Sequence, residues 1–256
     1  MATVETLPLL LKQIGLPMML THYQSLEAKA IEHQWSYPRY LTQLCELEAN
    51  NRYYKRVQRH VKESKLPAGK TVATFDFTCA PSVNQKAFLA LADNTAWVHQ
   101  ANNVIVFGPS GVGKTHLACA IGYRLIEQGV RVLFTSTTAL VQKLQEAKQQ
   151  FRLPDALAKL DRYPLLILDD IGYVKKNEQE TGVLFELIAQ RYETSSLLIT
   201  ANQPFSQWDS IFPDNMMAVA AIDRLVHHAH IFNIKEVSFR KTTADKKQGN
   251  KLKKIT

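Results

Sequence analysis

Near the middle of the chain, a glycine-rich run ends in a lysine and a threonine: Gly108-Pro109-Ser110-Gly111-Val112-Gly113-Lys114-Thr115. An apolar, strand-like segment (104–107) precedes this run, and a segment with apolar residues at helical spacing (116–128) follows it. Glycines let the backbone curl around an anion, so that consecutive N–H groups point at phosphate oxygens at a helix N-terminus. The run and its strand–loop–helix setting therefore predict a loop that binds a nucleoside triphosphate.

Two side chains of this loop have their own predicted roles. The Lys114 ammonium is expected to bridge the β- and γ-phosphates, and the Thr115 hydroxyl is expected to coordinate Mg²⁺. The backbone supplies the other phosphate contacts. The predicted phosphate-binding residues are Gly108, Pro109, Ser110, Gly111, Val112, Gly113, Lys114 and Thr115.

A second apolar run ends in two carboxylates. Residues 165–168 are all apolar, and Asp169 and Asp170 follow them directly. In a parallel sheet both acids emerge at the carboxyl edge, where ligands bind in such folds. We expect Asp169 to hold Mg²⁺. Asp170 is expected to polarise the attacking water, a task that needs a carboxylate near the metal but not on it.

A further strand-like run (197–201) delivers Asn202 to the same edge. A neutral amide can orient the water and touch the γ-phosphate without adding charge. An acid after the metal-binding aspartate, with a polar sensor one strand later, is typical of ATP hydrolases. It does not suit GTPases or small-molecule kinases, and the sequence has no Asn-Lys-x-Asp guanine-reading motif. The expected ligands are therefore ATP and Mg²⁺.

Strand and helix patterns alternate around these motifs, which predicts an α/β fold with a parallel sheet and helices on both faces. The predicted strands are 104–107, 130–135, 165–169 and 197–201, and the predicted helices are 114–128, 137–150 and 178–192.

The flanking sequence divides the chain into three predicted parts. Residues 1–66 have helical apolar spacing and form a small all-helical N-terminal domain. A stretch of turn residues (64–70) serves as the linker to an ATPase domain at 67–238. Residues 239–256 are polar and lysine-rich, which predicts a basic tail.

Composition adds exclusions. With 256 residues and 46% hydrophobic content, the chain can build a sizeable core. No apolar run is long enough to span a bilayer, and the N-terminus lacks a signal-peptide pattern, so we expect a cytoplasmic protein without a membrane partner. The three cysteines, Cys45, Cys79 and Cys119, are far apart and without metal-type spacing, which predicts buried free thiols.

The net charge of +8 is concentrated in two segments. Residues 240–256 hold seven Lys or Arg against one Asp, and residues 52–65 hold six against one Glu. Such segments suit contact with a polyanion, although a solvated basic face and a soluble tail are the simpler interpretation for an arbitrary protein. The basic residues that share one helical face, and are our candidate DNA contacts, are Arg52, Lys55, Arg56 and Arg59.

Several segments resemble the IstB-like transposition helper ATPases. They are the phosphate loop with His116-Leu117-Ala118, the segment 166–172, Thr200-Ala201-Asn202-Gln203-Pro204-Phe205 with Trp208, Asp223-Arg224-Leu225-Val226-His227-His228, and Phe75-Asp76-Phe77. The resemblance covers residues 10–240. That family belongs to the AAA+ ATPases and is similar to the DnaC-like helicase loaders.

The resemblance implies an AAA+ P-loop ATPase without a C-terminal helical lid. It further implies a homo-oligomer that forms on duplex DNA in an ATP-dependent way and selects or remodels the target DNA. The expected protein partner is the integrase-type transposase of the same insertion sequence. This context favours DNA binding over the simpler interpretation of the basic segments.

The resemblance also assigns roles to single residues. Arg224 is the candidate arginine finger that reaches the γ-phosphate of a neighbouring subunit, with Arg191 as a competitor. Arg240 falls where relatives have a sensor arginine. Phe75 either lies near the adenine or closes the core, and His116 continues the nucleotide-binding run.

Two alternative functions would also use the predicted phosphate loop. A helicase loader would bind a replicative helicase and single-stranded DNA, and a monomeric phosphate-transferring enzyme would need an acceptor site that the sequence does not show.

Most AAA+ proteins have Glu where this chain has Asp170, and the shorter side chain suits a slow switch. The histidines His227, His228 and His230 lack a fourth metal ligand in the sequence, so we interpret them as structural.

Overall fold

The structure is a computed structural model that describes residues 4–172, 178–210, 215–236 and 238. It divides into two compact units, Met1–Arg59 and His60–Thr256. Arg240 and the rest of the predicted basic tail lie outside the described residues. None of the helices in the described ranges is long and apolar enough to cross a membrane.

The first unit is helical, as predicted. It contains a 3₁₀ turn (Val4–Thr6), α1 (Leu7–Gln13), α2 (Pro17–Glu32) and the first part of α3 (Tyr37–Ser64). Prolines stand in the first turns of α1 and α2, where a missing N–H costs no intrahelical bond. Helix α3 continues into the second unit, so the division between the units falls inside this helix.

A buried carboxylate holds the first unit together. Glu48 on α3 is only 4% exposed, and its Oε2 accepts a 2.9 Å hydrogen bond from the N–H of Met18 in the first turn of α2. A carboxylate there also complements the positive end of the helix dipole. Arg52 pairs with Glu48 over 3.3 Å and donates to the carbonyl of Gly15 over 3.1 Å. One member of the predicted basic face is therefore also part of the packing.

The second unit contains a five-stranded, fully parallel sheet in the order β2-β3-β4-β1-β5. All four predicted strands and all three predicted helices are present, with ends shifted by a few residues. The strands are β1 (Asn103–Phe107), β2 (Val132–Ser136), β3 (Leu165–Asp169), β4 (Ser196–Ala201) and β5 (Ala229–Asn233). The helices are α4 (Gln85–Ala92), α5 (Ala96–His99), α6 (Lys114–Glu127), α7 (Thr137–Gln149), α8 (Leu153–Leu160), α9 (Glu178–Arg191) and α10 (Asn215–Val226), with 3₁₀ turns at Val72–Thr74, Phe77–Cys79 and Phe205–Ser210.

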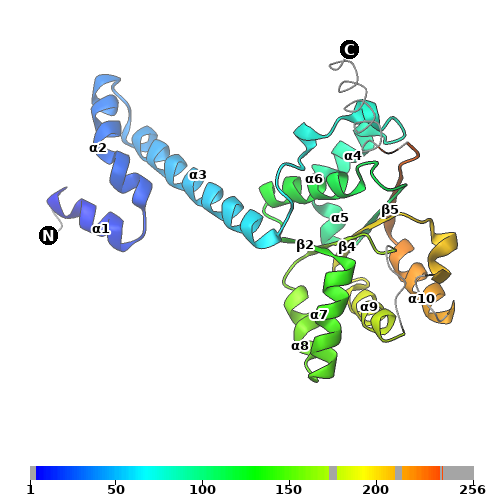
Figure 1. The fold of residues 1–256 in the computed structure, drawn as a ribbon. Helices are drawn as coiled ribbons and strands as arrows, with labels where there is room; N and C mark the ends of the chain where they lie inside the picture. Colours follow the sequence, from blue (N-terminus) through cyan, green and yellow to red (C-terminus); the bar gives the residue numbers. More distant parts are fainter. Residues whose placement is uncertain (1–3, 173–177, 211–214, 237, 239–256) are drawn as a thin grey trace, which may run out of the picture. The chain divides into compact units, whose positions relative to one another are not determined.

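Helices cover both faces of the sheet, with α4 and α6 on one side and α7 to α10 on the other (Figure 1). Alternate residues of each strand serve the two sides. On β3, Leu166 and Leu168 belong to the core cluster of α7 to α10. Ile167 points the opposite way, and a Cβ added at Gly122 of α6 would lie 3.0 Å from its Cδ1. This two-sided burial explains the uninterrupted apolar run in the sequence.

The edge strand β5 was not predicted from the sequence. Its residues, Ala229-His230-Ile231-Phe232-Asn233, mix polar and apolar side chains, and none of them is buried. Pairing with β1 fixes it in place, from Asn103 opposite Ala229 to Phe107 opposite Asn233. The signal for this strand therefore lies in its neighbour and not in its own pattern.

The prediction that the cysteines are buried is correct for one of the three. Cys119 on α6 is fully buried, and burial raises the pKa of its thiol to about 12. Cys45 and Cys79 are exposed, contrary to the expectation of burial. Cys45 lies on an outer face of α3, and Cys79 ends a 3₁₀ turn beside the site described next.

Candidate nucleotide-binding site

The glycine-rich loop joins β1 to α6 and depends on two of its glycines for steric reasons. Gly108 has φ +152° and Gly113 has φ +101°. A Cβ at Gly108 would lie 2.6 Å from the carbonyl oxygen of Ile234, and one at Gly113 would lie 2.8 Å from Cε2 of Phe75. Side chains at either position would collide with these neighbours, so the loop can hold its open curve only with glycine.

Lys114 folds back under this loop. Its Nζ donates to the carbonyl oxygens of Gly108 over 2.8 Å and of Pro109 over 2.9 Å, and the residue is only 9% exposed. A buried ammonium needs such acceptors because its charge has lost most of its water. The cation is thus held at the centre of the phosphate loop, where a γ-phosphate can compete for it.

Thr115 and Asp169, the two residues predicted to hold Mg²⁺, lie in hydrogen-bond contact at the base of the site. The Thr115 hydroxyl donates to Asp169, with Oγ1 2.9 Å from Oδ1 and 3.1 Å from Oδ2. Hydroxyl and carboxylate oxygens are the hard ligands that Mg²⁺ prefers. The first residue of α6 after the loop lysine and the last residue of β3 therefore fit a magnesium ion.

Thr200 on β4 extends this contact into a network. Its hydroxyl donates to Asp169 Oδ1 over 2.7 Å and accepts from the backbone N–H of Asp170 over 2.8 Å. Asp170 has φ +62°, a left-handed conformation, and it lines the same pocket as Thr115 and Asp169. Both aspartates are therefore placed by the neighbouring strand as well as by β3.

The role of Thr200 was missed in the sequence, and a signal for it existed. It is a polar residue that follows the apolar run 197–199 of β4, and it is fully buried. A buried hydroxyl needs hydrogen-bond partners, and the aspartates at the end of the adjacent strand supply them. Thr137 at the start of α7 is likewise buried, and its hydroxyl donates to the carbonyl oxygen of Asp169 over 3.1 Å.

Asn202 follows β4 directly and does not line the pocket. Its residue is half-buried, and its side-chain oxygen Oδ1 is buried without a hydrogen-bond partner among the described residues. An orphaned buried acceptor is uncommon because it costs free energy. Asn202 therefore lies at the carboxyl edge of the sheet, as predicted, but its side-chain oxygen is buried and has no hydrogen-bond partner among the described residues.

A pocket of about 390 Å³ opens at this edge of the sheet. Its walls come from three sources: the phosphate loop, the strand ends of β3 and β4, and the segment before α4. The lining residues are Lys70, Thr74, Phe75, Asp76, Cys79, Ala80, Ser110, Gly111, Val112, Gly113, Lys114, Thr115, His116, Asp169, Asp170 and Thr200.

Phe75 and His116 close one side of this pocket. The Phe75 ring packs edge-on to His116 with centroids 5.1 Å apart and to Phe77 at 4.8 Å. The His116 Nε2 lies 3.1 Å from Thr74 Oγ1 and 3.0 Å from the carbonyl oxygen of Thr71. Phe75 is thus both a pocket wall and a packing residue, and His116 ties α6 to the segment that forms this wall.

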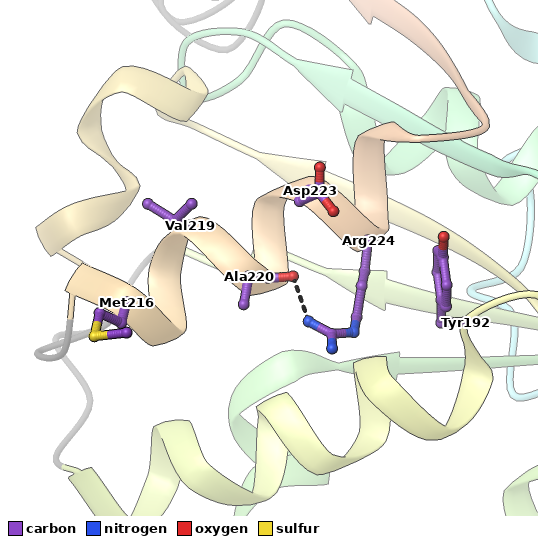
Figure 2. A pocket seen from close by; sticks show the side chains of 6 residues that line it. All are labelled: Tyr192, Met216, Val219, Ala220, Asp223 and Arg224. Carbon is purple, nitrogen blue, oxygen red and sulfur yellow. Dashed lines mark hydrogen bonds between the residues drawn. The ribbon is translucent and has the colours of Figure 1, made fainter.

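Arg224 lies outside the nucleotide pocket, on α10. It lines a separate surface pocket of about 550 Å³ with Tyr192, Met216, Val219, Ala220 and Asp223 (Figure 2). Its Nη1 donates to the carbonyl oxygen of Ala220 over 2.9 Å, and its guanidinium lies 5.3 Å from the ring centroid of Phe185. The side chain is half-buried, so it borders a solvent-open groove.

Arg191, the competing arginine, has a packing role. It is only 1% exposed, and its guanidinium donates to the carbonyl oxygens of Leu160, Tyr163, Pro164 and Ser196. Burial lowers the pKa of this guanidinium to about 10. A side chain enclosed in this way cannot reach a second molecule. Of the two arginines, only Arg224 is accessible.

The predicted basic face is present on α3 in the first unit. Arg52, Lys55, Arg56 and Arg59 are exposed on one continuous helix. Arg56 lies over the ring of Tyr53, 5.8 Å from its centroid. Arg52 also makes the packing contacts to Glu48 and Gly15, although its side chain is 61% exposed.

Solved structures with similar folds place this arrangement in a class. The chain superposes on AMPPCP-bound DnaA from Aquifex aeolicus with a TM-score of 0.55 and 17% identity, covering 66% of this chain and 51% of that one. The present chain therefore spans about half of DnaA. It matches the DnaC helicase loader with a TM-score of 0.50 and 21% identity, covering 72% and 99% of the two chains. The chain therefore has the fold of these nucleotide-binding-type α/β proteins, with a parallel sheet and a phosphate loop after β1.

Sequence comparison then identifies the family. The family described as IstB-like ATP binding protein matches residues 9–247. An insertion sequence ATP-binding protein from Sinorhizobium fredii is 47% identical over 93% of this chain and 80% of its own length. The ATP-binding protein of insertion sequence IS21 from Pseudomonas aeruginosa is 38% identical, over 93% and 89%. The chain belongs to the IstB-like ATP-binding proteins of insertion sequences.

Proposed function

We propose that this protein hydrolyses ATP as a regulatory switch and assembles on duplex DNA in its ATP-bound state. The observation that carries the proposal is the Thr115–Asp169–Thr200 hydrogen-bond network, which joins the phosphate loop to two strand ends. It offers oxygen ligands for Mg²⁺ directly beside the loop. The bound ion would neutralise charge on the β- and γ-phosphates and orient them for attack by water.

The protein's own residues supply the remaining functions of hydrolysis. Lys114 would exchange its two loop carbonyls for phosphate oxygens. Asp170 would accept a proton from the attacking water. Asn202 would orient that water after its side chain turned from its buried position toward the pocket. Phe75 would pack against the adenine from the pocket wall. A carboxylate one methylene shorter than Glu suits the slow turnover of a switch.

Assembly would link the site to a second subunit. Arg224 is accessible and lies in a groove away from its own nucleotide pocket, which supports a role in trans. As an arginine finger it would complete the ATP site of a neighbour, so that the nucleotide state controls oligomerisation. Met216 and Val219 on the same helix are 82% and 66% exposed, and these apolar side chains would be covered by the neighbouring subunit.

The DNA and protein partners follow from charge and family. Lys55, Arg56 and Arg59 would meet the phosphates of duplex DNA, with Arg52 in a partly structural role. The names of the relatives place them in insertion sequences, which supports the integrase-type transposase of the same element as the partner that this protein stimulates. Helicase loading is the alternative function. The similarity to the DnaC helicase loader concerns the fold alone and does not by itself support that function.

Two measurements test the proposal. Phosphate release should require Mg²⁺ and should be lost in Asp170→Asn while ATP binding is retained. Unchanged hydrolysis in Asp170→Asn would remove this residue from the mechanism. Separately, ATP should promote assembly on duplex DNA more strongly than on single-stranded DNA of the same length. A preference for the single strand, with capture of a replicative helicase in place of a transposase, would support the loader function instead.

A further inference from the structure

A cluster of potential metal ligands lies at the ends of α9 and α10, apart from the nucleotide pocket. One ligand atom from each of Glu193, His227 and His228 lies within 4.8 Å of the other two. The sequence brings the two histidines together, but only the fold adds the glutamate, which directly follows Tyr192 at the end of α9. All three side chains are exposed, so an ion can reach them from solvent.

The hydrogen bonding of His227 fits metal ligation. Its Nδ1 lies 2.8 Å from the hydroxyl oxygen of Tyr192. In metal sites, a ligating histidine usually engages its second ring nitrogen in such a hydrogen bond, which fixes the tautomer and the ring orientation. With Nδ1 engaged, Nε2 is the nitrogen available for an ion. The structure thus contains both a set of ligands and a residue that orients one of them.

The spacing requires only a small adjustment. Bonds from zinc to histidine nitrogen or carboxylate oxygen are about 2.0–2.2 Å long, which separates tetrahedral ligands by roughly 3.4 Å. Exposed side chains within 4.8 Å can close to this separation by rotating about their χ angles. The His227 and His228 rings already lie close together, with centroids 4.0 Å apart. Two imidazoles and one carboxylate suit a borderline ion such as Zn²⁺ better than Mg²⁺ or Ca²⁺.

We propose that Glu193, His227 and His228 form a second metal site, which binds a divalent zinc-type ion with water in the fourth position. The ion would join the turn after α9 to the turn after α10. Tyr192 and Arg224 both line the groove of Figure 2, and Phe185 on α9 lies against the Arg224 guanidinium. The site therefore links the turn that contains Tyr192 to the end of α10, the helix that carries the other residues lining the Arg224 groove.

Isothermal titration of the full chain with ZnCl₂, in the absence of nucleotide, tests the site. Wild type should show a zinc-binding event that EDTA reverses and that His227→Ala/His228→Ala abolishes. Glu193→Gln should weaken it, and Tyr192→Phe should weaken it by about 10- to 100-fold because His227 loses its orienting partner. His230→Ala, a change of an exposed histidine outside the cluster, should leave it unchanged, as should Asp169→Asn in the nucleotide pocket.

Thermal unfolding gives an independent measurement and controls for misfolding. At a zinc concentration about a hundred times the dissociation constant, the Tm of wild type should rise by roughly 5 °C or more. Without zinc, the cluster variants should melt close to wild type because their side chains are exposed. The proposal is overturned if wild type binds no zinc, or if the double histidine variant binds it with the same stoichiometry and affinity.

Discussion

The Thr115 hydroxyl donates a 2.9 Å hydrogen bond to Oδ1 of Asp169, which joins the first turn of α6 to the end of β3. The same Oδ1 accepts a 2.7 Å bond from Thr200 on β4. Three elements far apart in the sequence therefore meet at one carboxylate. These hydrogen bonds hold the candidate magnesium ligands in place within the fold itself.

Replacing Thr200 with Val should disrupt these hydrogen bonds while keeping nearly the same side-chain volume. The variant leaves the Asp170 N–H without its acceptor and removes one of the two hydroxyl donors to Asp169, while the Thr115 hydroxyl remains. We expect a loss of about 1–3 kcal/mol in the free energy of unfolding and a larger proportional fall in Mg²⁺-dependent ATP hydrolysis than in ATP binding. Denaturant unfolding and phosphate release measure the two effects. Thr194→Val, at an exposed threonine, is the matched control, and an equal effect there would contradict this account.

Arg191→Met should be a stability variant. Four carbonyl oxygens would lose the guanidinium donor, and those of Leu160 and Pro164 would keep a backbone N–H donor. A buried group left unsatisfied costs roughly 1–3 kcal/mol. We expect the free energy of unfolding to fall by about 3 kcal/mol or more, measured by denaturant titration. Arg162→Met changes an exposed arginine nearby and should be almost neutral. If Arg191→Met unfolds like wild type, its guanidinium is not the packing group described above.

Arg224→Ala should change ATP hydrolysis and leave the stability of the fold nearly unchanged. The side chain is half-buried, and its contact with Phe185 is worth at most about 1 kcal/mol. Folding and ATP binding by single subunits should therefore persist, while hydrolysis that depends on assembly is lost. Equilibrium nucleotide binding and phosphate release at increasing protein concentration separate these effects. Hydrolysis that rises with protein concentration as in wild type would exclude Arg224 as the residue acting in trans.

Thiol reactivity should distinguish the three cysteines. At about pH 8, the folded protein should react at Cys45 and Cys79, because both side chains are exposed. Cys119 should stay protected, because burial raises its pKa to about 12 and leaves almost no thiolate. ATP should slow modification of Cys79, which lines the nucleotide pocket, and leave Cys45 unaffected. Mass spectrometry after alkylation reads each site. Reaction of Cys119 in the folded protein, or equal protection of Cys45 and Cys79 by ATP, would contradict this prediction.

The basic face should control the salt dependence of DNA binding. Changing Lys55, Arg56 and Arg59 to Gln removes up to three phosphate contacts, which should lower the slope of log K against log salt by up to about 2.7. Fluorescence anisotropy with duplex DNA measures the slope. A variant with Lys12, Lys29 and Lys159 changed to Gln loses the same charge from exposed positions elsewhere. If both variants change the slope equally, net charge and not this face is responsible.

Sequence motifs predicted the parts of the site that have fixed local spacing. Lys114 and Thr115 follow the glycines of one loop, and Asp169 ends one apolar strand, so each could be identified within a short window. Thr200 could be singled out as a polar residue after an apolar run, but its partners could not, because they depend on the pairing of β3 with β4. A hydroxyl in a strand has no assigned partner until the neighbouring strand is known.

The remaining differences have the same origin. The strand β5 has a mixed pattern and is defined by its pairing with β1. Glu193 joins His227 and His228 only because α9 and α10 end beside each other. Arg191 and Arg224 have the same chemistry in the sequence, and only their burial separates a packing residue from an accessible one. Tertiary neighbours supplied what local patterns lacked.

Sedimentation velocity of the full chain with duplex DNA tests the central claim most directly, with ATP and Mg²⁺ in one cell and ADP and Mg²⁺ in another. The account predicts a large, DNA-bound assembly in ATP that falls apart in ADP, and no such assembly for Lys114→Ala in either nucleotide. A monomer in both nucleotides, or an assembly of the same size in ATP, in ADP and in Lys114→Ala, would contradict it.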